Sequence, residues 1–307
     1  MNLEAFILGS GGMMPLPGRF LTSVLLRREG ELFLFDCGEA TQISLKRLNL
    51  KWKKISRIFI SHVHADHITG LPGILMLSAQ VDRDEPLYVY GPARLKEYIE
   101  FHKQYMYLNY EIIVEEIKPG TVIYENDEYH IETFALRHTV PCLAYALVEK
   151  SRPGIFFPEK AQELGVKPGP LYARLQAGET ITLDDGTKVS PSQVMGESRS
   201  GRKFCFITDT EFFPEIAPFA ADSDLLICES MFRKGMEETG KEKKHLSSVQ
   251  AAEIARNAGN VKKLGLIHYS PRYMKSEIEE MALEAKTVFP DTFLTKDRMH
   301  IPIPFVD

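Results

Sequence analysis

Short runs of apolar residues, bounded by glycine or charged residues, alternate along this chain with stretches of helical periodicity. The short runs predict strands, at 5–9, 23–27, 31–36, 57–61, 87–91, 111–117, 121–134, 143–149, 202–209, 224–230 and 263–269. Apolar residues spaced three and four apart predict helices, at 39–50, directly after His67, and at 93–105, 247–259 and 276–288. Mixed strands and helices of this kind predict an α/β or α+β sandwich.

The pattern changes near residue 150. Between residues 151 and 186 the chain carries four prolines, at 153, 158, 168 and 170, together with several glycines. A segment with this composition forms neither a core strand nor a long helix. We predict an insertion at residues 150–196 that projects from the domain as a flexible arm and contains one short helix near 159–165.

Composition places the chain among ordinary globular proteins. It has 307 residues, of which 44% are hydrophobic and 26% charged, and a formal net charge of −5. This balance excludes a globally basic nucleic-acid binder but leaves room for local basic patches. We expect a single domain over residues 1–307.

The cysteines and the termini indicate a cellular location. Four scattered cysteines without a CxxC pair favour free thiols in a reducing compartment. The first residues lack the features of a signal peptide, and no run of 18 apolar residues occurs. We therefore expect a cytoplasmic protein with no membrane partner.

The segment RIFISHVHADHITGLPG (57–73) is the most informative motif. A predicted strand ends at Ser61, and alternate residues beyond a strand end point the same way, so His62 and His64 can face one metal ion. Asp66 and His67 follow after a turn and reach a second position. Imidazole and carboxylate ligands suit Zn²⁺, Mn²⁺ or Fe. The competing interpretation is a polar surface loop that happens to be rich in histidine.

The HxHxDH pattern resembles that of the metallo-β-lactamase superfamily. The resemblance implies an α+β fold, the αβ/βα four-layer sandwich, with the motif at one edge. It also implies three further ligands in order, and this chain has His138, Asp209 and His268 close after predicted strands. By the resemblance, one metal is held by His62, His64 and His138, the other by Asp66, His67 and His268, and Asp209 bridges them. We expect two Zn²⁺ ions per subunit, with Mn²⁺ or Fe as alternatives.

Other segments narrow the resemblance to the short form of the ribonuclease Z family. They are FDCGEATQ (35–42), CESMF (228–232), His245 in KKHLSS, and HYSPRY (268–273), and they extend the similarity over almost the whole chain. The family removes the 3′ trailer of precursor tRNA as a homodimer. The resemblance implies attack by metal-bound hydroxide, which leaves a 3′-hydroxyl tRNA and a 5′-phosphate trailer.

The resemblance also implies the proton-transfer groups. Glu229 would orient His245, which would relay a proton to the leaving 3′-oxygen, and Asp66 would accept the proton of the attacking water. A histidine held in one tautomer by a carboxylate suits such a role. The competing interpretations are a local ion pair for Glu229 and a surface-loop residue for His245.

Basic residues supply candidate RNA contacts. Residues 46–57 carry six basic and no acidic side chains, residues 150–175 have a net charge of +3, and residues 233–244 have a net charge of +2. In the family the arm binds precursor tRNA, and here Lys167 and Arg174 would lie at its tip. Clustered Lys and Arg bind phosphates by releasing counterions, although solvated helix ends and loops are often basic too.

Arg19, Arg272 and Tyr273 are further candidates for contacting substrate, although a salt bridge is an alternative for Arg272. The chain departs from the family pattern at two places. PLPGRF (15–20) keeps Arg19 but has Phe20 where the family's PxKxRN loop has Asn, and Cys228 replaces a histidine. Both departures concern how precursors that carry CCA are treated and where they are cut.

Two other functions remain open from the sequence. One is a superfamily hydrolase of small phosphodiesters, sulfate esters or thioesters, which would need neither arm nor basic patches. The other is a non-catalytic RNA-binding protein, which the complete set of ligands argues against.

Overall fold

The computed structural model describes residues 2–81 and 83–305 and divides them into two compact units. The larger unit comprises the chain up to Asn126, then His130–Val148 and Lys203–Pro304. The smaller unit is formed mainly by Glu149–Arg202. Met1, Val306 and Asp307, the ends of the predicted domain, lie outside the described residues.

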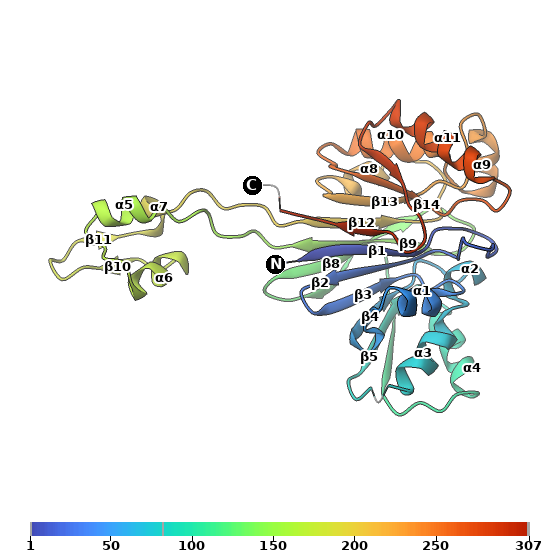
Figure 1. Cartoon of the computed structure of the whole chain (residues 1–307), viewed down its shortest axis with the longest axis horizontal. Coiled ribbons are helices and arrows are strands. Elements are labelled where there is room, and N and C mark those ends of the chain that lie inside the picture. The colour runs from blue at the N-terminus through green and yellow to red at the C-terminus, as the bar shows by residue number, and fades with distance from the viewer. Residues whose placement is uncertain (1, 82, 306–307) are drawn as a thin grey trace. The chain divides into compact units, whose positions relative to one another are not determined.

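Two seven-stranded sheets form the larger unit (Figure 1). The first has the order β16-β1-β2-β3-β4-β5-β6, with the strands β16 (His300–Pro302), β1 (Leu3–Gly9), β2 (Ser23–Arg28), β3 (Glu31–Phe35), β4 (Ile55–Phe59), β5 (Leu87–Gly91) and β6 (Ile112–Glu116). The second has the order β15-β14-β13-β12-β9-β8-β7, with the strands β15 (Thr292–Leu294), β14 (Leu264–Ile267), β13 (Leu225–Glu229), β12 (Lys203–Ile207), β9 (Cys142–Glu149), β8 (Tyr129–Leu136) and β7 (Val122–Glu125). The predicted strand 121–134 is therefore two strands, because Asn126, Asp127 and Glu128 form a turn between β7 and β8.

Aromatic side chains fill the space between the sheets. The Phe35 ring on β3 lies 6.1 Å from that of Tyr145, 5.1 Å from that of Phe204 and 5.9 Å from that of Phe206, all on the second sheet. All four residues are fully buried. Strand alternation turns the other face of each sheet outward, toward helices.

Helices cover those outer faces (Figure 1). Beside the first sheet lie α1 (Thr41–Arg47), α2 (Ala65–Ile68), α3 (Leu71–Ala79) and α4 (Leu95–Lys103), with a short 3-10 turn at Trp52–Lys54. Beside the second lie α8 (Ile216–Ala220), α9 (Glu237–Lys243), α10 (Ser248–Ala258) and α11 (Lys275–Lys286). The helix–sheet–sheet–helix layers confirm the predicted α+β four-layer sandwich.

The smaller unit contains more structure than the sequence predicted. Besides the expected helix α5 (Pro158–Glu163), it has α6 (Pro170–Gln176), α7 (Pro191–Val194) and the strand pair β10 (Ile181–Thr182) and β11 (Lys188–Val189). The prediction of one helix was wrong because a proline at the first helical position has no hydrogen bond to lose, and each of these helices begins at one. Six buried apolar residues form the unit's own core, Ala161, Val166, Leu175, Ile181, Val189 and Val194.

Two further properties concern the cysteines and the helices. All four cysteines are buried free thiols, as predicted. Among the described residues, no helix has the length and hydropathy needed to traverse a lipid bilayer.

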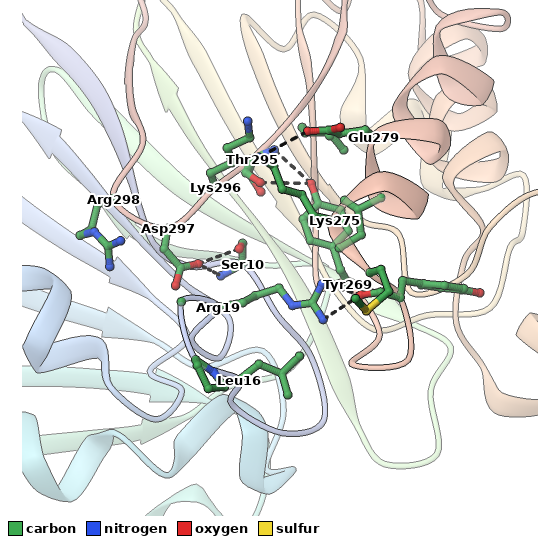
Figure 2. A pocket seen from close by; sticks show the side chains of 16 residues that line it. Ser10, Leu16, Arg19, Tyr269, Lys275, Glu279, Thr295, Lys296, Asp297 and Arg298 are labelled. Atoms are coloured by element: carbon green, nitrogen blue, oxygen red, sulfur yellow. Dashed lines mark hydrogen bonds and ion pairs between the residues drawn. The ribbon is translucent and has the colours of Figure 1, made fainter.

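A cavity of about 540 Å³ opens in the larger unit, between the loop at residues 16–19, the start of α11 and residues 294–298 (Figure 2). Arg19 extends across it, and Nη2 of Arg19 lies 3.3 Å from the carbonyl oxygen of Ser270 and 3.3 Å from that of Tyr273. Arg19 thus links the loop at residues 16–19 to the segment that follows His268.

Candidate metal centre and active site

The predicted ligands are brought together because they follow strands whose ends meet. The strand pairs β3–β4, β12–β13 and β13–β14 are all parallel, so their carboxyl ends lie at common sheet edges. His62 and His64 follow β4, Asp209 follows β12, and His268 follows β14. His138 enters from the end of β8.

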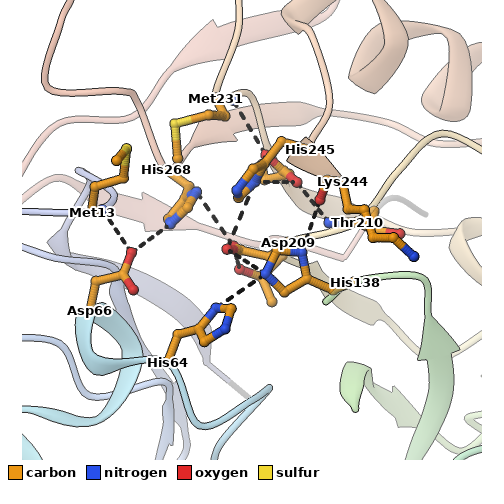
Figure 3. A network of polar contacts seen from close by, with 12 residues as sticks. Met13, His64, Asp66, His138, Asp209, Thr210, Met231, Lys244, His245 and His268 are labelled. Carbon is orange, nitrogen blue, oxygen red and sulfur yellow. Dashed lines mark hydrogen bonds and ion pairs between the residues drawn. The ribbon is translucent and has the colours of Figure 1, made fainter. Parts of the chain in front are cut away.

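The first group consists of His62, His64, His138 and Asp209, whose candidate ligand atoms all lie within 4.8 Å of one another. Nδ1 of His64 lies 3.1 Å from Nε2 of His62 and 3.2 Å from Nε2 of His138. Asp209 Oδ2 lies 3.6 Å from Nε2 of His62 and 3.8 Å from Nε2 of His138. Figure 3 shows His64 and His138 turned toward Asp209.

The second group consists of Asp66, His67 and His268. Nε2 of His268 lies 3.2 Å from Nε2 of His67 and 3.2 Å from Oδ2 of Asp66. The other oxygen of Asp209, Oδ1, lies 3.3 Å from Nε2 of His67. One carboxylate therefore faces both groups, as a bridging ligand would.

The donor set fits metal ions better than hydrogen bonds. Nδ1 of His138 is 2.9 Å from the backbone carbonyl of Lys244, which can only accept, so Nε2 of His138 carries a lone pair directed at the other imidazoles. Nδ1 of His268 is buried, has no hydrogen-bond partner among the described residues, and lies 3.4 Å from Oδ1 of Asp209. Lone pairs that converge in this way repel one another, and a buried ring nitrogen without a hydrogen bond remains unsatisfied. A cation among these atoms would relieve both effects.

The electrostatics of the cluster also favour cations. Burial, together with the charge on neighbouring His67, lowers the pKa of His62 well below its ordinary value, which keeps the imidazole neutral as a ligand must be. Burial raises the pKa of Asp209, but nearby His268 and His67 outweigh it and hold that pKa well below its ordinary value. Asp209 is therefore a buried carboxylate whose charge must be compensated.

Glu229 pairs with His245, and Figure 3 shows His245 beside His138 and Asp209. Nδ1 of His245 lies 3.2 Å from both carboxylate oxygens of Glu229, and Glu229 also accepts from the backbone N–H of Thr210 at 2.8 Å. Burial lowers the pKa of His245, but Glu229 and Asp209 outweigh it and raise that pKa to about 9. His245 can therefore hold a proton at neutral pH and present it through the nitrogen that does not face Glu229.

Asp66 accepts a hydrogen bond from a backbone segment that the sequence analysis did not identify. The backbone N–H of Met13 donates to Asp66 Oδ2 at 2.7 Å, and Met13 adopts a left-handed φ of 66°. Met13 is 61% exposed and lies beside Asp66 (Figure 3), so the metal cluster has an exposed apolar side chain next to one of its proposed ligands.

The residues predicted to contact substrate do not form one cluster as the predicted metal ligands do. Arg19 and Tyr273 both line the cavity of Figure 2, and the Tyr273 hydroxyl accepts from the backbone N–H of Arg233 at 3.3 Å. Arg272 is exposed, its guanidinium carbon lies 5.2 Å from the centre of the Phe232 ring, and its Nε donates to Oγ of Ser270 at 3.1 Å.

Two of the predicted substrate contacts, Lys167 and Arg174, belong to the smaller unit. Lys167 is exposed between α5 and α6. Arg174 on α6 pairs with Glu179 at 2.7 Å, and both side chains are exposed.

The sequence did not reveal that Asp36 and Ser61 contact the metal cluster. Oγ of Ser61 donates to Oδ2 of Asp36 at 2.8 Å. Asp36 directly follows β3, is fully buried, and lies 2.7 Å from Nδ1 of His67. Its signal was a carboxylate placed directly after an apolar strand in the FDCGEATQ segment, but the sequence alone does not say which histidine it meets.

Comparison with known proteins shows full-length similarity. The chain is 57% identical to "Ribonuclease Z" of Treponema denticola, over 100% of both chains, and 56% identical to that of Treponema pallidum (strain Nichols), over 99% of both. It is 43% identical to that of Borrelia hermsii, over 98% of this chain and 97% of the relative. A family model described as anti-Pycsar protein Apyc1 matches residues 3–148.

Solved structures give the same result at the level of fold. Human tRNase Z, short form, superposes with a TM-score of 0.71 at 25% identity, over 98% of this chain and 100% of that one. The metallo-β-lactamase fold protein YhfI from Bacillus subtilis superposes with a TM-score of 0.70 at 18% identity, over 98% and 100% of the two chains. The second likeness concerns the fold alone.

Proposed function

This chain belongs to the ribonuclease Z family, and from that premise we propose that it removes the 3′ trailer of precursor tRNA with the aid of two bound Zn²⁺ ions. Members of the family are hydrolytic endonucleases that act on phosphodiester bonds, and the products proposed here are a 3′-hydroxyl tRNA and a 5′-phosphate trailer. The observation that carries the proposal is the convergence of seven predicted ligands on two adjoining groups that share Asp209.

Metal binding is assigned to those seven residues. One ion would be held by His62, His64 and His138, the other by Asp66, His67 and His268, with Asp209 between them. When bound, two divalent cations supply hydroxide at neutral pH and stabilise charge on the phosphoryl oxygens. Imidazole and carboxylate ligands also accept Mn²⁺ or Fe, which a metal analysis of the purified protein distinguishes.

The chain's own residues would move the protons. Asp66 is held by the Met13 N–H and His268 and would accept a proton from the attacking water. His245, charged at neutral pH beside Glu229, would give a proton to the 3′-oxygen as its bond to phosphorus breaks. Glu229 does not meet the RNA in this scheme; it fixes the orientation of the His245 ring.

Substrate binding is proposed to involve the smaller unit. As the arm, residues 150–196 would hold precursor tRNA through exposed basic side chains such as Lys167 and Arg174, while Arg19, Arg272 and Tyr273 would serve near the metal centre. The protein would act as a homodimer in the cytoplasm. These roles are supported by the family membership and by the separate folding core of the smaller unit.

A direct experiment tests the cleavage reaction. The Zn²⁺-loaded protein is incubated with a precursor that carries a 3′ trailer, with and without an encoded CCA, and the new 3′ ends are mapped. We expect release of the trailer with a 3′-hydroxyl, and loss of cleavage in Asp209→Asn. Intact RNA, or equal cleavage by both proteins, would refute the proposal.

A second candidate, hydrolysis of small phosphodiesters or other esters, has one observation in its favour. Every proposed ligand, together with Glu229 and His245, lies in the larger unit. The smaller unit has a natural place for truncation, because Phe156 and Met195 form a β-bridge with each other. Replacing residues 158–193 by Asn-Gly keeps that bridge and also keeps Phe157 and Val194 as the pair that closes a two-residue turn, since the backbone N–H of Phe157 donates to the carbonyl of Val194 at 2.8 Å. If the arm binds RNA, this variant loses tRNA cleavage but retains turnover of bis(p-nitrophenyl) phosphate; parallel losses would favour the second candidate.

A further inference from the structure

Asp36 is a buried carboxylate that the proposed reaction does not use. It directly follows β3, adopts a left-handed φ of 54° and has no exposed surface. Oδ1 accepts the backbone N–H of Ser61 at 2.7 Å, and Oδ2 lies 2.8 Å from Ser61 Oγ and 2.7 Å from Nδ1 of His67. An ionised carboxylate only accepts hydrogen bonds, so each of these partners must donate.

These contacts decide which nitrogen of His67 carries a proton. Because Asp36 accepts from Nδ1, the neutral ring has its lone pair on Nε2. Nε2 is the atom that lies 3.2 Å from Nε2 of His268 and 3.3 Å from Oδ1 of Asp209. Asp36 therefore turns His67 into a ligand directed at the second group.

Ser61 fixes the tautomer of His62, in the first group, in the same way. Its Oγ lies 3.0 Å from Nδ1 of His62. A hydroxyl has one hydrogen, and Ser61 donates it to Asp36, so Ser61 Oγ must accept from Nδ1 of His62. The lone pair of His62 is then also on Nε2, which lies 3.1 Å from Nδ1 of His64.

We propose that Asp36 is a positioning residue shared by both metal groups, acting directly on His67 and through Ser61 on His62. This inference rests on the metal centre of the proposed function. It adds that metal binding by the first group and metal binding by the second group both depend on Asp36. Removing the negative charge of Asp36 lowers the affinity of both groups for their metal ions. Removing the Ser61 hydroxyl lowers the affinity of the first group only.

Asp36→Asn tests the inference with almost no change in shape. The backbone N–H of Ser61 requires an oxygen at the Oδ1 position, so the amide NH₂ takes the place of Oδ2. That NH₂ faces Nδ1 of His67 and Ser61 Oγ, and it donates where the carboxylate accepted. His67 must then carry its proton on Nε2, which blocks its lone pair.

The measurement is binding of Zn²⁺ alone in competition with a chromogenic chelator, together with the visible spectrum of the Co²⁺-loaded protein. Loss of outer hydrogen-bond partners typically costs about 10–100-fold in metal affinity. We expect losses of this order at both sites in Asp36→Asn, with altered Co²⁺ bands. Ser61→Ala is expected to weaken only one of the two sites.

Matched controls separate this effect from general disturbance of buried polar residues. Asp224→Asn changes a buried carboxylate that contacts Lys203 and Lys262 and no proposed ligand. Ser44→Ala removes a buried hydroxyl that donates to the carbonyl of Leu8. Both controls are expected to bind two ions with unchanged affinity.

Each outcome is decisive. A folded Asp36→Asn protein that binds two Zn²⁺ ions as tightly as the unaltered protein overturns the inference. If circular dichroism shows that Asp36→Asn does not fold, Ser61→Ala decides, since unchanged affinity at both sites overturns it equally. An unaltered protein that binds fewer than two ions refutes the two-metal part of the proposed function instead.

Discussion

Gly12 leaves no space for a side chain beside His268, and this predicts that Gly12→Ala damages the metal centre. A Cβ added at Gly12 would lie 2.5 Å from Nε2 of His268, 2.6 Å from Cε1 and 2.8 Å from Cδ2. The backbone at Gly12 does not have a positive φ, so alanine is compatible with its conformation. The contact with the imidazole is therefore the main physical effect of the change.

The size of the effect follows from that contact. Ordinary van der Waals contacts begin at 3.4 Å, so the ring must move by about 0.9 Å. His268 is fully buried and already has a left-handed φ of 64°. Metal–ligand distances tolerate only about 0.2 Å. We expect at least about a 10-fold loss of affinity at the second group and about a 100-fold loss of cleavage rate. Overpacking would cost about 1–3 kcal/mol of stability.

Gly30→Ala is the matched control. A Cβ at Gly30 meets nothing within 4 Å, and its φ is not positive. This variant is expected to be as stable as the unaltered protein or slightly more so. Zn²⁺ affinity, cleavage of a 3′-extended precursor tRNA and urea unfolding are measured for both variants. If Gly12→Ala matches Gly30→Ala in metal affinity and cleavage rate, the argument that His268 is held against Gly12 as a ligand is wrong.

Three further predictions concern the same centre. Removing divalent ions with a chelator should lower the melting temperature, because Asp209 and the converging imidazoles lose their compensating charge, and adding Zn²⁺ back should restore it. Met13→Glu should raise KM for precursor tRNA by charge repulsion without changing metal content, because Met13 holds Asp66 through its backbone N–H. Cys228→His should lower the free energy of unfolding by about 1–3 kcal/mol in urea, because Cys228 is fully buried in the core beside the second sheet.

The resemblance to the metallo-β-lactamase superfamily predicted the four-layer sandwich and the members of the metal cluster, and one physical feature is common to the positions of several of these ligands. A polar residue directly after an apolar strand lies at a sheet edge, and parallel strands bring such edges together. His62, Asp209 and His268 each occupy such a position, and the structure brings them into one cluster. Residues whose neighbours are fixed by chain order and strand direction can be placed without knowing side-chain packing.

Residues whose partners depend on packing could not be placed. Asp36 meets His67 across 31 positions in the sequence, and no periodicity links them. Tyr273 lies five residues after His268, yet its hydroxyl faces the backbone of Arg233. The prolines of the arm were misjudged for a related reason, because proline ends a helix or begins one according to its position, and the sequence does not show that position directly.

Metal binding also changes how the net charge of the chain should be interpreted. Four acidic side chains, Asp36, Asp66, Asp209 and Glu229, lie in or beside the cluster, and they are part of the formal charge of −5. Two divalent cations would add four positive charges, which balances these carboxylates and reduces the formal net charge from −5 to −1. The metal-free protein, with its formal net charge of −5, would therefore repel RNA more strongly than the metal-loaded protein. Metal ions would thus serve substrate binding as well as chemistry, because they neutralise the place where the RNA backbone must approach.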